Sequence, residues 1–226
     1  MTPIDPAHLE ALRVLGHELR RPLTVIRGAA TMLLEDGDAL PPAARRQMLE
    51  LLENGVEAMN DMIDDLSTAV HLQAGDLGLG LEALDPASVI EEAVAAVRRQ
   101  EPGREVEVRC PPGLEVEADR GQAVRVLRAL IANAARFSPS AAPVEVVAQP
   151  EPGRVRVEVL DRGPGIPADR RHLAFEPFTR LDHRAGGPGL GLFLARELVH
   201  AMGGEIGIVD RDGGGCAVWV TLSRRG

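Results

Sequence analysis

The first third of the chain repeats apolar residues at alternating steps of three and four, the spacing of a helix that packs along one seam. The first seam consists of Leu9, Leu12, Gly16, Leu19, Leu23, Ile26, Ala30 and Leu33. The segment EDGDALPP at 35–42 interrupts it, and the second seam consists of Met48, Leu52, Gly55, Met59, Met62, Leu66 and Ala69. The two seams predict an antiparallel helical hairpin over 5–72, with Asp5 as its N-cap. Because one hairpin buries little core, we expect two copies to form a homodimeric four-helix bundle.

The periodicity changes after LQAGDLGLG at 72–80. Helical patterns follow at about 86–100, 119–137 and 189–203, and strands are predicted at 104–110, 143–149, 154–161, 205–210 and 216–222. The strands at 143–149 and 154–161 alternate apolar and polar residues at period two. This order predicts an α/β domain in which helices cover one face of a mixed sheet. We therefore divide the chain into a hairpin at 1–73, a linker at 74–80 and an α/β domain at 81–226.

Composition narrows the class of protein. The 226 residues are 45% apolar and 26% charged, which is typical of a globular protein, and the scarcity of aromatics predicts an aliphatic core. A net charge of -9 argues against nucleic-acid binding, and no apolar run is long enough to predict a membrane segment in this chain. Two distant cysteines form no metal-binding spacing and favour a reducing, cytoplasmic setting.

The segment HELRRPLT at 17–24 places a histidine beside a glutamate, just before a proline that disturbs helical hydrogen bonding. His17 lies one step off the seam, next to solvent, with Arg21 on the same surface. Glu18 can hydrogen-bond one ring nitrogen of His17 and leave the other as a nucleophile. A histidine on a helix surface usually has no such role, so this interpretation requires a phosphoryl donor elsewhere in the chain.

Three later segments have the chemistry of a nucleotide site. DRGPGI at 161–166 follows a strand, and its glycines allow close backbone approach. GGPGLGL at 186–192 opens a helix whose N–H groups can hold phosphates. NAARFS at 133–138 ends a helix with a carboxamide suited to Mg²⁺ and an arginine suited to phosphate. Each segment is weak evidence by itself, but the presence of all three in this order and spacing is a strong signal of a nucleotide site.

These segments together resemble the transmitter core of bacterial sensor histidine kinases, over about residues 8–224. GHELRRPLT, RALIANAARFS, DRGPGIP, FEPFTR and GGPGLGL are similar to the H, N, G1, F and G2 boxes of that family. The resemblance implies a dimerisation and phosphotransfer hairpin followed by a Bergerat-type ATP-binding α/β sandwich. It implies an enzyme of a two-component system that autophosphorylates with ATP and Mg²⁺ and passes the phosphoryl group to a response regulator receiver domain.

The resemblance also implies roles for individual residues. His17 would accept the phosphoryl group, and Glu18 would orient or deprotonate it. Asn133 would bind Mg²⁺, and Asp161 would accept the adenine amino group. Phe175 and Phe178 would anchor a lid at about 167–186. The implied nucleotide-binding set is Asn133, Arg136, Phe137, Asp161, Gly163, Gly165, Ile166, Phe178, Gly187, Gly189, Leu190 and Gly191.

The chain departs from the family pattern at several positions. Arg21 stands where a small polar residue usually serves phosphatase activity, so we expect that activity to be weak. Pro188 replaces the usual threonine of the G2 box, and the lid segment TRLDHRAGG is short, so we expect nucleotide to be held loosely.

Two other functions fit parts of the sequence. A gyrase-like ATP hydrolase would carry a glutamate four residues before Asn133, where this chain has Ala129. A non-catalytic, dimeric nucleotide-binding module would tolerate Pro188 and the short lid. Because only sixteen residues precede His17, we expect the signal to come from an upstream sensor module or a signalling partner.

Overall fold

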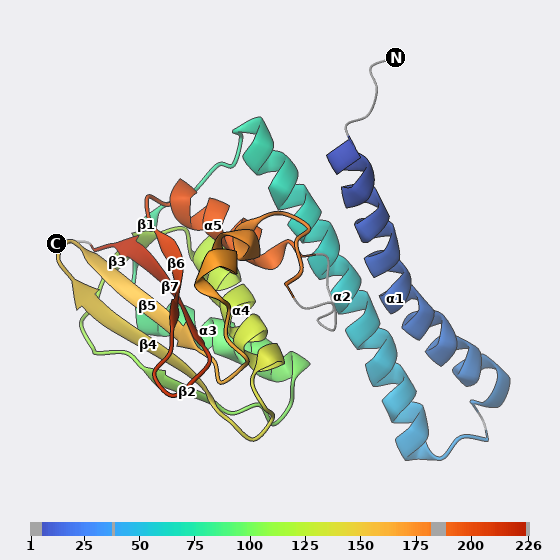
Figure 1. Cartoon of the computed structure of the whole chain (residues 1–226). Helices are drawn as coiled ribbons and strands as arrows, with labels where there is room; N and C mark the ends of the chain where they lie inside the picture. Colours follow the sequence, from blue (N-terminus) through green and yellow to red (C-terminus); the bar gives the residue numbers. More distant parts are fainter. Residues whose placement is uncertain (1–5, 38, 182–188, 225–226) are drawn as a thin grey trace. The chain divides into compact units, whose positions relative to one another are not determined.

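The computed structural model describes residues 6–37, 39–181 and 189–224, which fall into two compact units divided between Gln73 and Ala74 (Figure 1). The first unit is helical and the second is an α/β domain with a mixed sheet, so the predicted order of fold classes is confirmed. Asp5, the predicted N-cap, lies outside the described residues. Within the described ranges, no helix is long and apolar enough to cross a membrane.

The first unit is a hairpin of two long helices, α1 (Pro6–Asp36) and α2 (Pro42–Ala74). Helix α1 continues through Pro22, and two residues later the Thr24 hydroxyl donates a hydrogen bond to the Arg20 carbonyl at 2.7 Å. Gly55 explains how the helices approach each other closely. A Cβ atom added there would lie only 2.6 Å from Cγ1 of Ile26, so a larger residue would push the helices apart.

The second unit is built on a five-stranded sheet in the order β2-β4-β5-β7-β6. Its strands are β2 (Val106–Arg109), β4 (Val144–Glu151), β5 (Arg154–Leu160), β6 (Ile206–Asp210) and β7 (Cys216–Ser223). Strands β2 and β4 are parallel, and the other neighbours are antiparallel, so the sheet is mixed as predicted. Two three-residue strands that the sequence did not indicate, β1 (Glu82–Leu84) and β3 (Val116–Ala118), form a separate antiparallel pair.

Three helices lie over one face of this sheet (Figure 1): α3 (Pro86–Gln100), α4 (Arg120–Phe137) and α5 (Gly191–Ala201). The side chains of Asp85 and Asp119 cap α3 and α4 by accepting hydrogen bonds from backbone N–H groups of their first turns. Buried aliphatic residues fill the space between helices and sheet, as the composition predicted. A 3₁₀ helix, η1 (Ala168–Phe175), occupies the first part of the segment at 167–186 that was predicted to be a lid.

Candidate functional site

His17 and Glu18 lie side by side on α1 with opposite exposure. The His17 side chain is 72% exposed, whereas that of Glu18 is 2% exposed. Nδ1 of His17 lies 3.5 Å from Oε1 of Glu18, and the other carboxylate oxygen lies 3.6 Å from Nη1 of Arg21. The carboxylate therefore stands between an imidazole and a guanidinium, and Nε2 is the ring nitrogen directed away from it.

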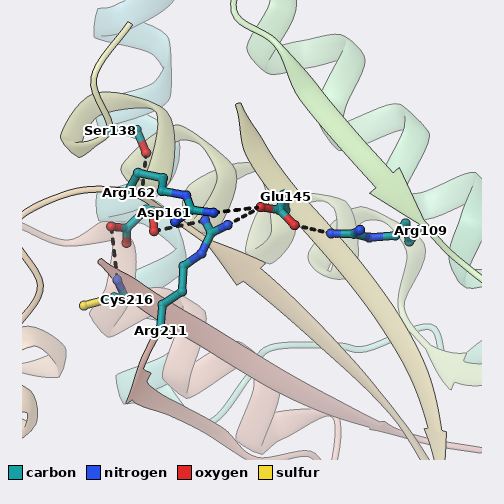
Figure 2. A network of polar contacts seen from close by, with 7 residues as sticks. All are labelled: Arg109, Ser138, Glu145, Asp161, Arg162, Arg211 and Cys216. Atoms are coloured by element: carbon teal, nitrogen blue, oxygen red, sulfur yellow. Dashed lines mark hydrogen bonds and ion pairs between the residues drawn. The ribbon is translucent and has the colours of Figure 1, made fainter. Parts of the chain in front are cut away.

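Asp161 follows β5, and its carboxylate is held by the backbone. Oδ1 accepts hydrogen bonds from the N–H groups of Gly163 at 2.7 Å and Cys216 at 3.2 Å (Figure 2). The backbone N–H of Asp161 in turn donates to the Cys216 carbonyl at 2.9 Å. Because both of these side-chain bonds end at Oδ1, the second oxygen of a largely buried carboxylate is left to accept a donor from a ligand.

Glycine is required around Asp161 because the backbone packs tightly there. A Cβ atom at Gly163 would lie 3.0 Å from both Oδ1 of Asp161 and the carbonyl oxygen of Phe137. At Gly215, whose φ is +100°, a Cβ atom would lie only 2.1 Å from the Asp161 carbonyl oxygen. A larger residue at Gly215 would therefore displace the Asp161 backbone, and one at Gly163 would crowd the Asp161 carboxylate and the Phe137 carbonyl by a few tenths of an ångström.

The loop that begins at Asp161 is also fixed by side chains from distant parts of the chain. The hydroxyl of Ser138, just after α4, accepts a hydrogen bond from the Arg162 N–H at 2.9 Å. Nε of Arg171, in η1, donates to the Ile166 carbonyl at 3.1 Å, and its guanidinium also pairs with Asp210 in β6. The two ends of the loop are therefore tied to α4, η1 and the sheet.

The C-terminal part of α4 carries Asn133 and Arg136, which are partly buried and exposed, respectively. Arg104 holds the chain as it leaves this helix, because its guanidinium donates to the carbonyls of Ser138 at 3.1 Å and Pro139 at 3.0 Å. Within the described ranges, no group of three or more His, Cys, Asp or Glu side chains gathers to hold a metal ion. The single carboxamide of Asn133 is compatible with Mg²⁺, because this ion usually takes most of its ligands from phosphate oxygens and water.

The turn after Phe175 lies against the start of α5. Phe178 has a φ of +60°, which is uncommon for a residue with a side chain, and its N–H donates to the Gly189 carbonyl at 3.1 Å. Gly189 has a φ of +73°, and a Cβ atom there would lie 2.7 Å from the Thr179 carbonyl oxygen. Leu190 is buried beside it and precedes α5, which begins at Gly191.

The structure thus gathers most of the predicted nucleotide-binding residues in the second unit, along the end of α4, the loop after β5 and the start of α5. Gly187 and Pro188 lie outside the described residues, as does the last part of the predicted lid, residues 182–186. His17 and Glu18 belong to the first unit.

Sequence reasoning missed a group of charged residues at the same end of the sheet (Figure 2). Glu145, in β4, pairs with Arg211 and with Arg109, and Arg211 also donates to the Asp161 carbonyl at 3.2 Å. Alternation at 143–149 predicted a strand there and gave no role to Glu145. Its partners lie 66 and 36 residues away, so no local pattern could identify them.

We predict that the Glu145 carboxylate makes stability depend on acid pH. Burial raises its pKa, but hydrogen bonds and charges from Arg211 and Arg109 outweigh burial and hold the pKa below its ordinary value. Its stabilisation should therefore be complete above the unfolded pKa of about 4.3 and disappear as pH falls through the lower folded value. Glu145→Gln should have a lower urea midpoint than the wild type at pH 7, and the difference between the two midpoints should be smaller at pH 3. Unfolding is followed by the fluorescence of Trp219, the single tryptophan.

The matched control is Glu107→Gln, at the exposed position opposite Glu145 in β2. It should leave the urea midpoint nearly unchanged at both pH values. An effect of Glu145→Gln that is equally large at pH 7 and pH 3 would contradict this assignment.

Two family profiles cover most of the chain. Residues 7–75 match the His Kinase A (phospho-acceptor) domain, and residues 118–226 match the histidine kinase-, DNA gyrase B- and HSP90-like ATPase. The sensor protein KdpD of Mycobacterium tuberculosis is 30% identical over 97% of this chain and 26% of its own length. This chain spans between 23% and 40% of the length of the curated relatives that it matches.

Solved structures give the same result. The mycobacterial sensor histidine kinase MprB is 33% identical, with a TM-score of 0.58 over 64% of this chain and 98% of that one. Full-length ShkA in complex with AMPPNP is 30% identical, with a TM-score of 0.67 over 95% of this chain and 46% of that one.

Proposed function

Because this chain belongs to the sensor histidine kinase family, we propose that it transfers the γ-phosphoryl group of ATP to His17. The observation that carries this proposal is an exposed imidazole, 3.5 Å from a buried carboxylate, on a helix that matches the phospho-acceptor domain. The match of residues 118–226 to an ATPase domain supports the second unit as the ATP-binding part. Accordingly, we assign the hairpin to 1–73, the linker to 74–80 and the catalytic domain to 81–226.

The proposed reaction uses Nε2 of His17 as the nucleophile. Its lone pair attacks the γ-phosphorus, a P–N bond forms, and the bond to the β–γ bridging oxygen breaks so that ADP leaves. The ring becomes positively charged as the bond forms. Glu18 faces Nδ1, so its carboxylate stabilises that charge or accepts the Nδ1 proton. The phosphoryl group then passes to an aspartate carboxylate of a response regulator, which restores neutral His17.

We assign the binding of ATP to the second unit. Oδ2 of Asp161 accepts a hydrogen bond from the adenine amino group, while Oδ1 remains bonded to the backbone. Arg136 contacts phosphate, and Asn133 supplies a protein ligand to Mg²⁺, which neutralises phosphate charge when bound. The remaining residues assigned to the nucleotide site are Phe137, Gly163, Gly165, Ile166, Phe178, Gly187, Gly189, Leu190 and Gly191.

The proposed partners are a second copy of this chain, a response regulator receiver domain and an upstream sensor module or signalling protein. Use of ATP and of a response regulator suits a cytoplasmic location. The alternative of a gyrase-like ATP hydrolase is not favoured, because Ala129 offers no carboxylate to activate water and residues 7–75 match a phospho-acceptor domain.

The test is incubation of the chain with γ-labelled ATP and Mg²⁺. We expect label on the protein that is lost in acid and kept in alkali, as a phosphoramidate requires, and no label after chelation of Mg²⁺. Asn133→Asp and Asp161→Asn should both remove it by weakening metal and adenine contacts. ATP hydrolysis without labelling would favour the hydrolase instead, and nucleotide binding without either reaction would favour a non-catalytic module.

We predict that Arg21 limits phosphatase activity toward the phosphorylated regulator. Its guanidinium has no acceptor for the attacking water, and it pairs with Glu18 at 3.6 Å. Arg21→Thr should accelerate dephosphorylation about tenfold, the value of one well-placed hydrogen bond. The measurement uses purified phospho-regulator freed of ATP, with Arg20→Thr on the adjacent exposed position as the control. Strong phosphatase activity of the wild type, with no gain in Arg21→Thr, would disprove the prediction.

A further inference from the structure

We infer that Arg211, held by Glu145, is a positioning residue for Asp161 and that this pair sets the preference of the site for adenine. The inference rests on the proposed function, since it assumes that Asp161 binds the base. Figure 2 shows the arrangement: the Arg211 guanidinium lies between the Glu145 carboxylate and the Asp161 backbone. Nη2 pairs with Oε1 of Glu145, and Nη1 donates to the Asp161 carbonyl at 3.2 Å.

The pair bridges three strands at one end of the sheet. Arg211 lies in the turn between β6 and β7, Glu145 lies near the start of β4, and Asp161 follows β5. The strands lie in the order β4-β5-β7-β6. The guanidinium of Arg211 therefore extends from the β6–β7 turn across the ends of β7 and β5 to β4. The end of β5 is therefore held by more than its own ladder hydrogen bonds.

The side chains of Arg211 and Glu145 meet in largely buried surroundings. The side chain of Arg211 is 6% exposed and that of Glu145 is 17% exposed. A guanidinium in such surroundings needs partners for its N–H groups, and the Glu145 carboxylate and the Asp161 carbonyl supply two of them. A lysine carries a single ammonium group and lacks the planar fork that engages both partners.

The Asp161 carbonyl is the group through which the pair acts on the site. The N–H of Asp161 bonds to Cys216, Oδ1 bonds to Gly163 and Cys216, and the carbonyl accepts from Arg211. Gly215 packs against the same carbonyl, at a distance that excludes any side chain. Without Arg211, the peptide between Asp161 and Arg162 loses a charged donor, and the direction of Oδ2 becomes less defined.

Arg109 provides an internal comparison. It pairs with the other oxygen of Glu145, but its side chain is 60% exposed. Substitution of Arg109 removes a positive charge from the same carboxylate and keeps the donor to the Asp161 carbonyl. Arg109→Met is therefore the matched control for Arg211→Met.

The experiment compares the affinities of the full chain for ATP and inosine triphosphate, which has a carbonyl in place of the adenine amino group. We expect the wild type to prefer ATP, Asp161→Asn to lose that preference, and Arg211→Met to reduce it about tenfold through weaker ATP binding, the size expected for loss of one charge-assisted hydrogen bond. Affinity for inosine triphosphate should change little. Arg109→Met should keep the wild-type ratio. Arg211→Lys and Glu145→Gln should give intermediate ratios, and they serve as the test if Arg211→Met does not fold.

The outcomes separate this inference from the proposed function. A wild type that binds neither nucleotide contradicts the proposed function. The inference is overturned if the wild type clearly prefers ATP and Arg211→Met, or the two milder variants, retain that preference in full. Equal losses of affinity for both nucleotides would also overturn it, because the pair would then only stabilise the fold.

Discussion

His17→Gln is expected to abolish labelling of the chain by γ-labelled ATP and to leave ATP affinity unchanged. Glutamine retains a polar side chain of similar length, but its amide nitrogen is not a nucleophile. His17 belongs to the helical hairpin, whereas the residues assigned to ATP lie in the α/β unit, so the substitution removes the acceptor and keeps the donor site. Nucleotide binding measured by calorimetry and labelling measured on gels test the two halves of this statement.

His71→Gln is the matched control, because His71 lies in the last turn of α2 in the same hairpin. It should keep the label at the wild-type level. Glu18→Gln should retain slow labelling, with a rate reduced by about two orders of magnitude, because a general base contributes roughly 10²–10⁴ in rate. Undiminished labelling of His17→Gln would exclude His17 as the acceptor.

Local signals in the sequence predicted most of the fold. The helices predicted to begin at about 86 and 119 begin at Pro86 (α3) and Arg120 (α4), directly after the caps Asp85 and Asp119. Period-two alternation located strands β4 and β5 within a few residues. Strands β1 and β3 were missed because three residues are too few to establish a period, and their pairing joins segments about 35 residues apart.

The candidate site was predictable where its residues occur in short motifs and hidden where they depend on tertiary contacts. Asp161 and Gly163 stand two residues apart, and the glycine serves the aspartate directly. Arg211 was not identified, since its role arises only when the β6–β7 turn meets the end of β5. The motif therefore indicates which group to assign to the base, and the fold determines what holds that group in place.

The exposed surface of α2 carries an apolar stripe that the sequence analysis did not identify, because its residues lie next to the predicted seam. Leu49, Val56, Ile63 and Val70 recur every seven residues and are 53%, 48%, 55% and 63% exposed. Seven residues bring a helix back to nearly the same direction, so the four side chains form one continuous line. The seam residue Leu23 on α1 also stays 47% exposed within the single chain. Such a line of aliphatic side chains at heptad spacing favours contact with another helix.

We predict that this stripe packs against a second copy of the hairpin and that Ile63→Glu converts the dimer to a monomer. Ile63 lies in the middle of the stripe, and the two-fold symmetry of a homodimer would place two new carboxylates in the interface. An unpaired buried charge costs about 3–5 kcal/mol, which would weaken dimerisation more than a hundredfold. Sedimentation at micromolar concentration should show a wild-type dimer and a folded monomeric variant.

Asn54→Glu provides the matched control for the added charge. Asn54 is exposed on the same helix, two residues before Val56 and therefore roughly 200° around the axis from the stripe. It should leave the wild-type mass unchanged. Leu23→Glu places a charge on the exposed seam residue of α1 and should also dissociate the dimer. A stable wild-type monomer would contradict the prediction. A dimer that survives both Ile63→Glu and Leu23→Glu would contradict it as well, because two chains could not bury these charges together.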